Sequence, residues 1–122
     1  MDDQTAATIA AVERFNEAFN AHDVDAVMAS MTDDCVFEST TPPAGERFVG
    51  SAAVRKVWDE LFSSSPTAHF DGEEVIATGD RCVVRWTYTW VEGDGTEGRV
   101  RGVDVLRVRD GLVAEKLAYA KG

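Results

Sequence analysis

The chain has 122 residues, 44% of them hydrophobic and 28% charged, which is typical of one globular domain with its own core. Its 22 acidic and 12 basic residues give a net charge of −10, which disfavours binding to nucleic acid or to an anionic membrane. No apolar run reaches the roughly 18 residues of a membrane span, and the acidic start does not resemble a signal peptide. We therefore expect one cytoplasmic domain over residues 1–122.

Cysteine and histidine are sparse and carry no metal-site pattern. Cys35 and Cys82 are the only cysteines, and neither belongs to a paired motif. His22 and His69 are isolated from each other and from the cysteines. We expect reduced, buried thiols, no protein-bound metal and no cofactor.

Three helices are predicted in the first half of the chain. The first begins at Thr5 or Thr8 and reaches about residue 21, and a short second helix follows Asp23 as its N-cap. Residues 32–34 are typical of a turn, and residues 35–40 alternate as a short strand. A brief extended piece at 48–49 precedes the third helix, which Ser51 is expected to cap and which ends near Pro66.

Strands dominate the second half. Residues 69–77, 81–91, 97–109 and 112–120 alternate between apolar and polar, and glycine-containing turns separate them. Helices gathered first and strands last indicate an α+β domain, in which the helices cover one face of an antiparallel sheet.

The chain resembles the SnoaL-like proteins of the nuclear transport factor 2-like superfamily. The resemblance rests on residues 15–28, on residues 33–37, on Gly50 before the third helix, and on residues 102–111 before the last strand. It implies a cone-shaped, curved antiparallel sheet closed by three helices around an apolar pocket. It leaves the activity open, because the fold hosts isomerases, cyclases, epoxide hydrolases and proteins without activity.

Asp104 is the candidate catalytic residue, because it is the one charged residue on an otherwise apolar strand face. Burial would favour its protonated form, which could donate a hydrogen bond to a carbonyl oxygen or act as a general acid. Alternatively, Asp104 is held by a backbone amide, a tyrosine hydroxyl or an arginine and has only a structural role.

Two mechanisms known in this fold are disfavoured. In ketosteroid isomerases Asp104 would match the carboxylic acid of the oxyanion hole, but Phe15 stands for the tyrosine donor and Ser39 for the general base. The epoxide hydrolases use Arg and Asp two residues apart, whereas Arg101 and Asp104 are three apart and on opposite strand faces. A cyclase of the SnoaL type needs only a pocket acid.

The remaining candidates are pocket residues for a flat, apolar ligand, and they are mostly aromatic or aliphatic. Tyr88 and Tyr119 could orient a carbonyl group, whereas Glu38 is expected to face away from the pocket. The predicted lining consists of Phe15, Phe19, Phe37, Ser39, Val57, Trp58, Leu61, Trp86, Tyr88 and Tyr119.

The outer sheet face is implied by the resemblance to be a homodimer interface. Every second residue of two neighbouring strands points to this face. Four arginines near the end of the chain belong to it or lie near it, and we expect a solvated or interface surface: Arg99, Arg101, Arg107 and Arg109. The face consists of Arg85, Thr87, Thr89, Val91, Arg99, Arg101, Val103 and Val105.

Two functional hypotheses follow. The first is a homodimeric domain that binds a small, apolar, carbonyl-bearing molecule, with acid–base activity of a cyclase or isomerase type centred on Asp104. The alternative is a non-catalytic ligand-binding or dimerisation module of the same fold. A cavity too small for a bicyclic compound would argue against a cyclase.

Overall fold

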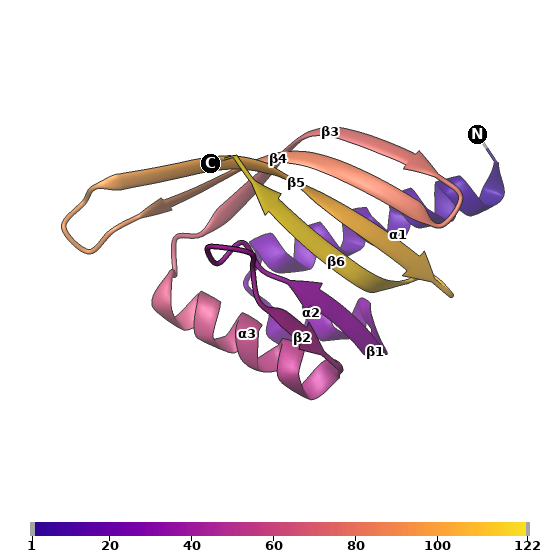
Figure 1. Ribbon diagram of the computed structural model, residues 1–122, viewed down its shortest axis with the longest axis horizontal. Coiled ribbons are helices and arrows are strands. Elements are labelled where there is room, and N and C mark those ends of the chain that lie inside the picture. The colour runs from indigo at the N-terminus through magenta and orange to yellow at the C-terminus, as the bar shows by residue number, and fades with distance from the viewer. Residues whose placement is uncertain (1, 122) are drawn as a thin grey trace.

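The computed structural model describes residues 2–121, which form three helices and one six-stranded sheet (Figure 1). The helices are α1 (Asp3–Asn20), α2 (Val24–Ala29) and α3 (Ser51–Ser64). The strands are β1 (Met31–Glu38), β2 (Arg47–Val49), β3 (His69–Thr78), β4 (Arg81–Val91), β5 (Glu97–Arg109) and β6 (Leu112–Ala120). Their order across the sheet is β2-β1-β6-β5-β4-β3.

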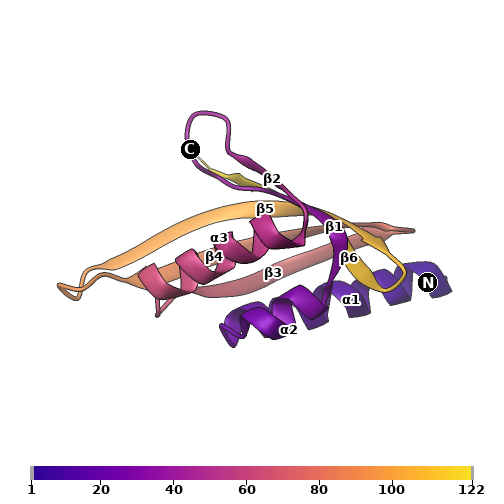
Figure 2. The same cartoon turned by 90° about the horizontal axis from the view of Figure 1, so that it is seen from below.

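The α+β class and the meander of the last four strands are confirmed. All three helices lie on one side of the curved sheet, and the other side has no helix over it (Figure 2). The prediction of a wholly antiparallel sheet is wrong at one pair, since β1 runs parallel to β6. A parallel pair needs a long connection, and the path through β2, α3 and β3–β5 supplies one between these two strands. None of the helices in residues 2–121 has the length and apolar character needed to cross a membrane.

Two predicted helix starts are corrected. Asp2, rather than Thr5 or Thr8, caps α1 by accepting a hydrogen bond from the Thr5 amide at 2.6 Å. The two threonines instead fasten α1 to the β3–β4 turn through the backbone N–H and C=O of Gly79, at 2.9 and 2.7 Å. At α3 the N-cap is Gly50, whose φ of 92° suits glycine, and no side chain caps the helix.

The predicted turn at residues 32–34 is also wrong, because β1 already begins at Met31. Met31 pairs with Val113 of β6, and the register then shifts before Val36 pairs with Glu115. The irregular stretch leaves Asp33 and Asp34 exposed, which explains why it has the composition of a turn.

A β-bulge between β5 and β6 decides which side chains enter the interior. Val108 pairs with Val113 and Arg107 with Glu115, so Ala114 is the extra residue on β6. Such an insertion reverses the facing of every following residue, because side chains alternate along a strand. Lys116 and Ala118 therefore face the helices, and Glu115, Leu117 and Tyr119 face outward.

Aromatic side chains fill much of the space between helices and sheet. Trp58 of α3 is fully buried and lies edge-on to Phe19 of α1, with ring centroids 5.5 Å apart. Trp86 of β4 reaches over Gly102 of β5, where an added Cβ would come within 2.7 Å of the indole ring. Gly102 thus gives the Trp86 indole the room it needs against the neighbouring strand.

Candidate functional site

A cavity of about 190 Å³ lies between the sheet and the helices α1 and α3, and we call it the aromatic cavity. Most of its wall is apolar, and its polar groups are few. It is lined by Phe19, Phe37, Ser39, Thr40, Val57, Trp58, Leu61, Phe70, Trp86, Tyr88, Val100, Lys116 and Ala118.

The structure brings eight of the ten predicted pocket residues to this cavity: Phe19, Phe37, Ser39, Val57, Trp58, Leu61, Trp86 and Tyr88. Phe15 is fully buried beside the cavity, with its ring 5.4 Å from Lys116 Nζ, and does not line it. The expectation for Tyr119 is wrong, since this side chain is 54% exposed and lies on the outer sheet face. The bulge at Ala114 is the reason, because an unbulged β6 would turn Tyr119 inward.

The same bulge brings Lys116, which the sequence reading missed, into the cavity wall. Lys116 Nζ lies 3.1 Å from Asp104 Oδ2, and each side chain is only 4% exposed. Asp104 therefore forms a buried ion pair with a lysine of the neighbouring strand. The partner is not among the arginine, tyrosine and backbone alternatives considered for Asp104.

Lys116 also lies within a cage of aromatic rings. Its Nζ is 5.0 to 5.9 Å from five ring centroids, within the range of cation–π attraction. The five rings are those of Phe15, Phe19, Phe37, Trp58 and Phe70. The rings and the carboxylate together compensate an ammonium group that has lost nearly all of its water.

Asp104 faces a second, neighbouring pocket rather than the aromatic cavity. This α1–β3 pocket has a volume of about 230 Å³ and is lined by Glu13, Asn16, Glu17, Asn20, Phe70, Gly72, Val75, Val84, Trp86 and Asp104. Phe70 and Trp86 belong to both walls and separate the two spaces. Lys116 is therefore the charged group that a ligand in the aromatic cavity would meet, with Asp104 behind it.

Several buried polar groups around these spaces have no partner within the described residues. They include the indole N–H groups of Trp58 and Trp86 and the Oδ1 atom of Asp104. Lys116 uses one of its three donors for Asp104. Buried polar groups are rarely left unpaired, so these atoms are the unusual feature of the two pocket walls.

Tyr88 adds a phenol to the aromatic cavity. Burial raises the pKa of Tyr88 above its ordinary value, so the group is neutral at pH 7 and can donate a hydrogen bond. Ser39 lines the opening but is held in its loop, where its Oγ accepts a hydrogen bond from the Glu46 amide at 3.1 Å.

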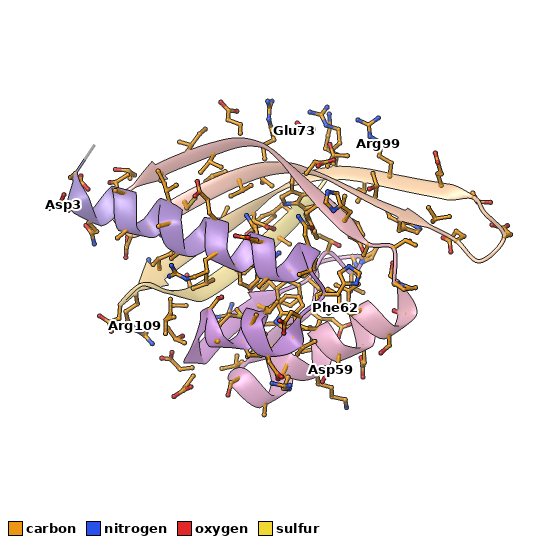
Figure 3. All side chains as sticks on the ribbon, turned by 180° about the vertical axis from the view of Figure 1, so that it is seen from behind. Asp3, Asp59, Phe62, Glu73, Arg99 and Arg109 are labelled. Carbon is orange, nitrogen blue, oxygen red and sulfur yellow. The ribbon has the colours of Figure 1, made fainter. Side chains whose placement is uncertain are left out.

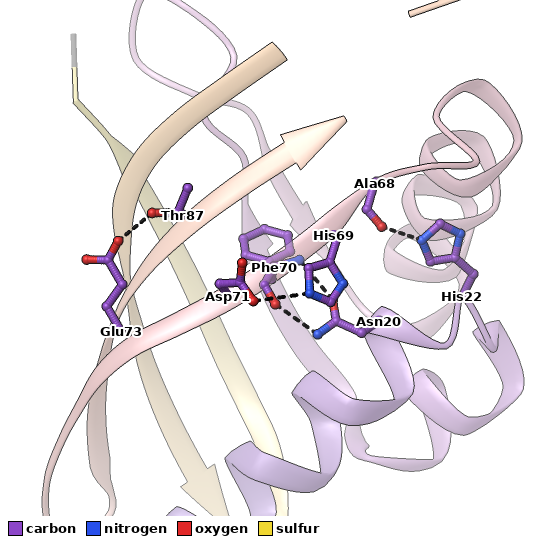
Figure 4. Close-up of polar contacts among 8 residues, drawn as sticks. All are labelled: Asn20, His22, Ala68, His69, Phe70, Asp71, Glu73 and Thr87. Atoms are coloured by element: carbon purple, nitrogen blue, oxygen red, sulfur yellow. Dashed lines mark hydrogen bonds and ion pairs between the residues drawn. The ribbon is translucent and has the colours of Figure 1, made fainter. Parts of the chain in front are cut away.

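Other candidates stand outside the cavity. Glu38 faces away, as expected, and pairs with Arg47 at 2.7 Å. The ring of His22 stacks on Phe62 and its Nε2 lies 2.7 Å from the Ala68 carbonyl oxygen, whereas His69 is on the surface beside Asp71 (Figure 4). Asn20 joins α1 to β3 by bonding both the N–H and the C=O of Phe70 at 2.9 Å (Figure 4).

The outer sheet face carries ion pairs of Arg85 and Arg101 with Glu73 and Glu74. Glu73 and Arg99 point away from the helices (Figure 3), and Arg101 bonds Glu73 at 2.8 Å. Hydrogen bonds from Arg101 and then from Thr87 lower the pKa of Glu73 to about 2. Apolar side chains remain exposed on this face, including Ile76 at 59% and Tyr119.

The cysteines are both buried and unpaired in disulfides, and burial raises the pKa of the Cys82 thiol to about 11. Among residues 2–121 there is no group of three or more His, Cys, Asp and Glu side chains placed to hold a metal ion.

The chain is similar to known proteins along nearly all of its length. Residues 12–116 match the model of the SnoaL-like domain. An NTF2-like protein of unknown function from Mesorhizobium loti is 37% identical over all of this chain and 97% of its own, with a TM-score of 0.82. No protein of curated function matches the chain.

More distant solved structures share the fold alone. A candidate SnoaL-like polyketide cyclase from Jannaschia sp. CCS1 is 18% identical, with 99% of this chain and 90% of the other covered and a TM-score of 0.85. A candidate ketosteroid isomerase from Kribbella flavida is 22% identical, with coverage of 98% and 81% and a TM-score of 0.80. The family match over residues 12–116 and the similarity along the whole chain agree, and the protein belongs to the SnoaL-like domain family.

Proposed function

We propose that this domain binds a small, neutral, carbonyl-bearing ring compound in the aromatic cavity, with the carbonyl oxygen on the Lys116 ammonium group. The observation that carries the proposal is a buried lysine in the cavity wall that makes one hydrogen bond and retains two donors. The unpaired indole N–H group of Trp58 adds one more donor beside the same cavity. Each of these groups calls for an acceptor such as a carbonyl oxygen.

The size of the cavity favours a single ring. A cavity of about 150 Å³ with apolar walls takes up benzene, and the aromatic cavity measures about 190 Å³. A ring of six atoms with small substituents matches this volume, and a polycyclic compound does not. The proposal therefore favours isomerase-type chemistry on a small ketone over cyclisation of a long polyketide.

Charge favours a neutral ligand over an anion. Lys116 and Asp104 already neutralise each other inside the protein. An anionic ligand would add a third charge with no counter-ion, and burying such a charge is costly. A neutral carbonyl oxygen accepts the hydrogen bond without this cost.

The chemistry available to the pair is polarisation of the carbonyl group. A hydrogen bond from Lys116 stabilises the negative charge that develops on the carbonyl oxygen when an α-proton passes to a base. The described residues of the cavity wall include no carboxylate or imidazole, so that base is water or hydroxide from solvent. Asp104 acts through Lys116 by holding the ammonium group in place, and it is the positioning residue of the pair. Structures of the same fold with bound small organic molecules support a ligand role: TerC was crystallised with polyporic acid, and a Catenulispora acidiphila protein was crystallised with trimethylamine.

The proposal predicts that cyclohexanone binds more tightly than methylcyclohexane, which has the same shape and no acceptor. One hydrogen bond to a charged group contributes about 1.5–3 kcal/mol, which is roughly a ten- to hundredfold preference. Titration followed by NMR shifts of the Trp58 and Trp86 indole signals measures both affinities. Cyclohexanecarboxylate should bind more weakly than the ketone.

The control is Asp104→Val/Lys116→Met, which replaces the ion pair with apolar groups of similar size and should lose the preference for the ketone. Equal affinity for the ketone and the hydrocarbon in the natural protein would refute the proposal. Exchange of the α-protons of cyclohexanone in D2O, followed on the same samples, separates the two functional hypotheses. Accelerated exchange supports acid–base activity, and binding without acceleration supports the non-catalytic binding module.

We also propose that the outer sheet face pairs with the same face of a second copy. Tyr119, Val103 and Ile76 offer apolar surface, and ion pairs of Arg85 and Arg101 with Glu73 reduce the like-charge repulsion between two such faces. Tyr119→Glu should convert a dimer to a monomer in size-exclusion chromatography with light scattering. Ala52→Glu, which adds the same charge to the exposed side of α3, should leave the mass unchanged. A natural protein that is monomeric at every concentration would refute this proposal.

A further inference from the structure

The α1–β3 pocket contains buried polar atoms that have no partner within the described residues. Asp104 Oδ1 is an acceptor without a donor, and its side chain is 4% exposed. Trp86 Nε1 is a donor without an acceptor, and the Trp86 side chain lines the same pocket. Glu13, Asn16 and Glu17 of α1 line this pocket with polar side chains. The pocket of about 230 Å³ is both roomy and polar enough to hold several water molecules.

The aromatic cavity on the other side of Phe70 and Trp86 differs in character. Its wall is mostly aromatic and aliphatic, and Asp104 does not belong to it. The Asp104–Lys116 pair therefore joins two spaces, with the carboxylate in the wall of the α1–β3 pocket, which has more polar lining residues, and the ammonium group in the wall of the aromatic cavity.

We propose that the α1–β3 pocket is a water-filled proton entrance, through which Asp104 and Lys116 exchange protons with solvent while the aromatic cavity stays dry. Water in the pocket bonds Asp104 Oδ1, and Lys116 Nζ lies 3.1 Å from Oδ2. Lys116 gives a proton to Oδ2, the carboxylic acid turns about its Cβ–Cγ bond and gives this proton to water, and the reverse steps return a proton from water to Nζ. The role of this entrance rests on the proposed function, because it serves the lysine that would bind the ligand. The Lys116 ammonium group that bonds the carbonyl oxygen of a ligand can then exchange its protons with solvent from the α1–β3 side while the ligand occupies the aromatic cavity.

The entrance can be filled without touching the ion pair. An added Cβ at Gly72 meets only Val84 Cγ1, at the ordinary contact distance of 3.7 Å, so a side chain can begin there without a clash. Asn16 is half-buried in the same pocket, and its side chain makes no hydrogen bond with other residues of the range 2–121. Gly72→Leu and Asn16→Leu therefore fill the α1–β3 pocket from two different elements. Thr40→Leu is the matched control, since Thr40 is an exposed residue of the aromatic cavity wall.

The experiment measures the rate at which the Lys116 ammonium protons exchange with water, by NMR of protein labelled with ¹⁵N at the lysine side chains and at fixed pH. Gly72→Leu and Asn16→Leu should each slow the exchange more than about tenfold, because exchange then requires a local opening of the structure. Thr40→Leu should leave the rate within about twofold of the natural protein.

Slower exchange in Thr40→Leu alone would place the path through the aromatic cavity and overturn the inference. Equal slowing in all three variants, or no slowing in any, would also overturn it. Failure of cyclohexanone to bind the natural protein would refute the proposed function and leave this result standing, so the two failures are distinguishable.

Discussion

Replacing Lys116 by methionine is expected to lower the free energy of unfolding by about 3–5 kcal/mol, because it leaves a buried carboxylate without its counter-charge. Asp104 and Lys116 are each 4% exposed, so the carboxylate that remains stays shielded from bulk solvent and has no cation beside it. A domain of this size is stable by only about 5–15 kcal/mol, and the loss is thus a large part of its stability. Urea unfolding followed by tryptophan fluorescence measures the difference.

Two further variants make this expectation specific to the pair. Asp104→Val/Lys116→Met removes both charges, and it should be more stable than Lys116→Met and close to the natural protein, since apolar replacement of a buried pair is often neutral or stabilising. Arg47→Met breaks the exposed pair with Glu38 and should cost less than about 1 kcal/mol. Additive losses in the double variant would show that the two charges do not stabilise each other.

Trp58→Ala is expected to cost about 3–5 kcal/mol, the range for large aromatic side chains removed from a core. Trp58 is fully buried, and its ring lies 4.6 to 6.2 Å from the ring centroids of Phe15, Phe19 and Phe37. The substitution would join a new void to the aromatic cavity, which already weakens packing at this place. Thermal or urea unfolding of the purified variant measures the loss.

The matched control is Trp90→Ala, at the half-buried end of β4. The Trp90 ring packs on the Gly98 position, and its indole N–H bonds Glu92 at 2.9 Å near the surface. Its removal should cost less than about 1.5 kcal/mol, because little of the core surrounds it. A loss as large as that of Trp58→Ala would show that the hairpin end, rather than the helix–sheet interface, holds the domain together.

The strands of the second half were predictable because their signals are local. The bounds of β4, β5 and β6 match the alternating runs, and glycine turns separate them. The apolar face with Asp104 as its one charge was also readable, since Gly102, Leu106 and Val108 share its parity and are all buried. Eight of the predicted pocket residues line the aromatic cavity for the same reason, because periodicity marks the side of an element that meets the core.

The sequence pattern did not reveal Lys116, because one extra residue in β6 shifts its pairing register with β5. From the Asp110-Gly111 turn, regular pairing would place Glu115, Leu117 and Tyr119 on the inner face, and a lysine between them reads as a solvent residue. The available signal was weak: Val113 and Ala114 are adjacent apolar residues at the start of β6, and both are buried. Such a doublet is compatible with a bulge and equally with a strand end.

Asp104 is thus paired with a buried lysine, whereas the pattern of its strand indicated a single acid on an apolar face. The sequence by itself determined an α+β domain, an apolar inner face and one acidic residue upon it, because each of these follows from local periodicity and turn chemistry. Only the tertiary structure decided that Lys116 faces Asp104, that Tyr119 lies outside, and that two separate pockets meet at the pair. These depend on the pairing of β5 with β6 and on the bulge at Ala114, which the interactions of neighbouring residues along the chain do not fix.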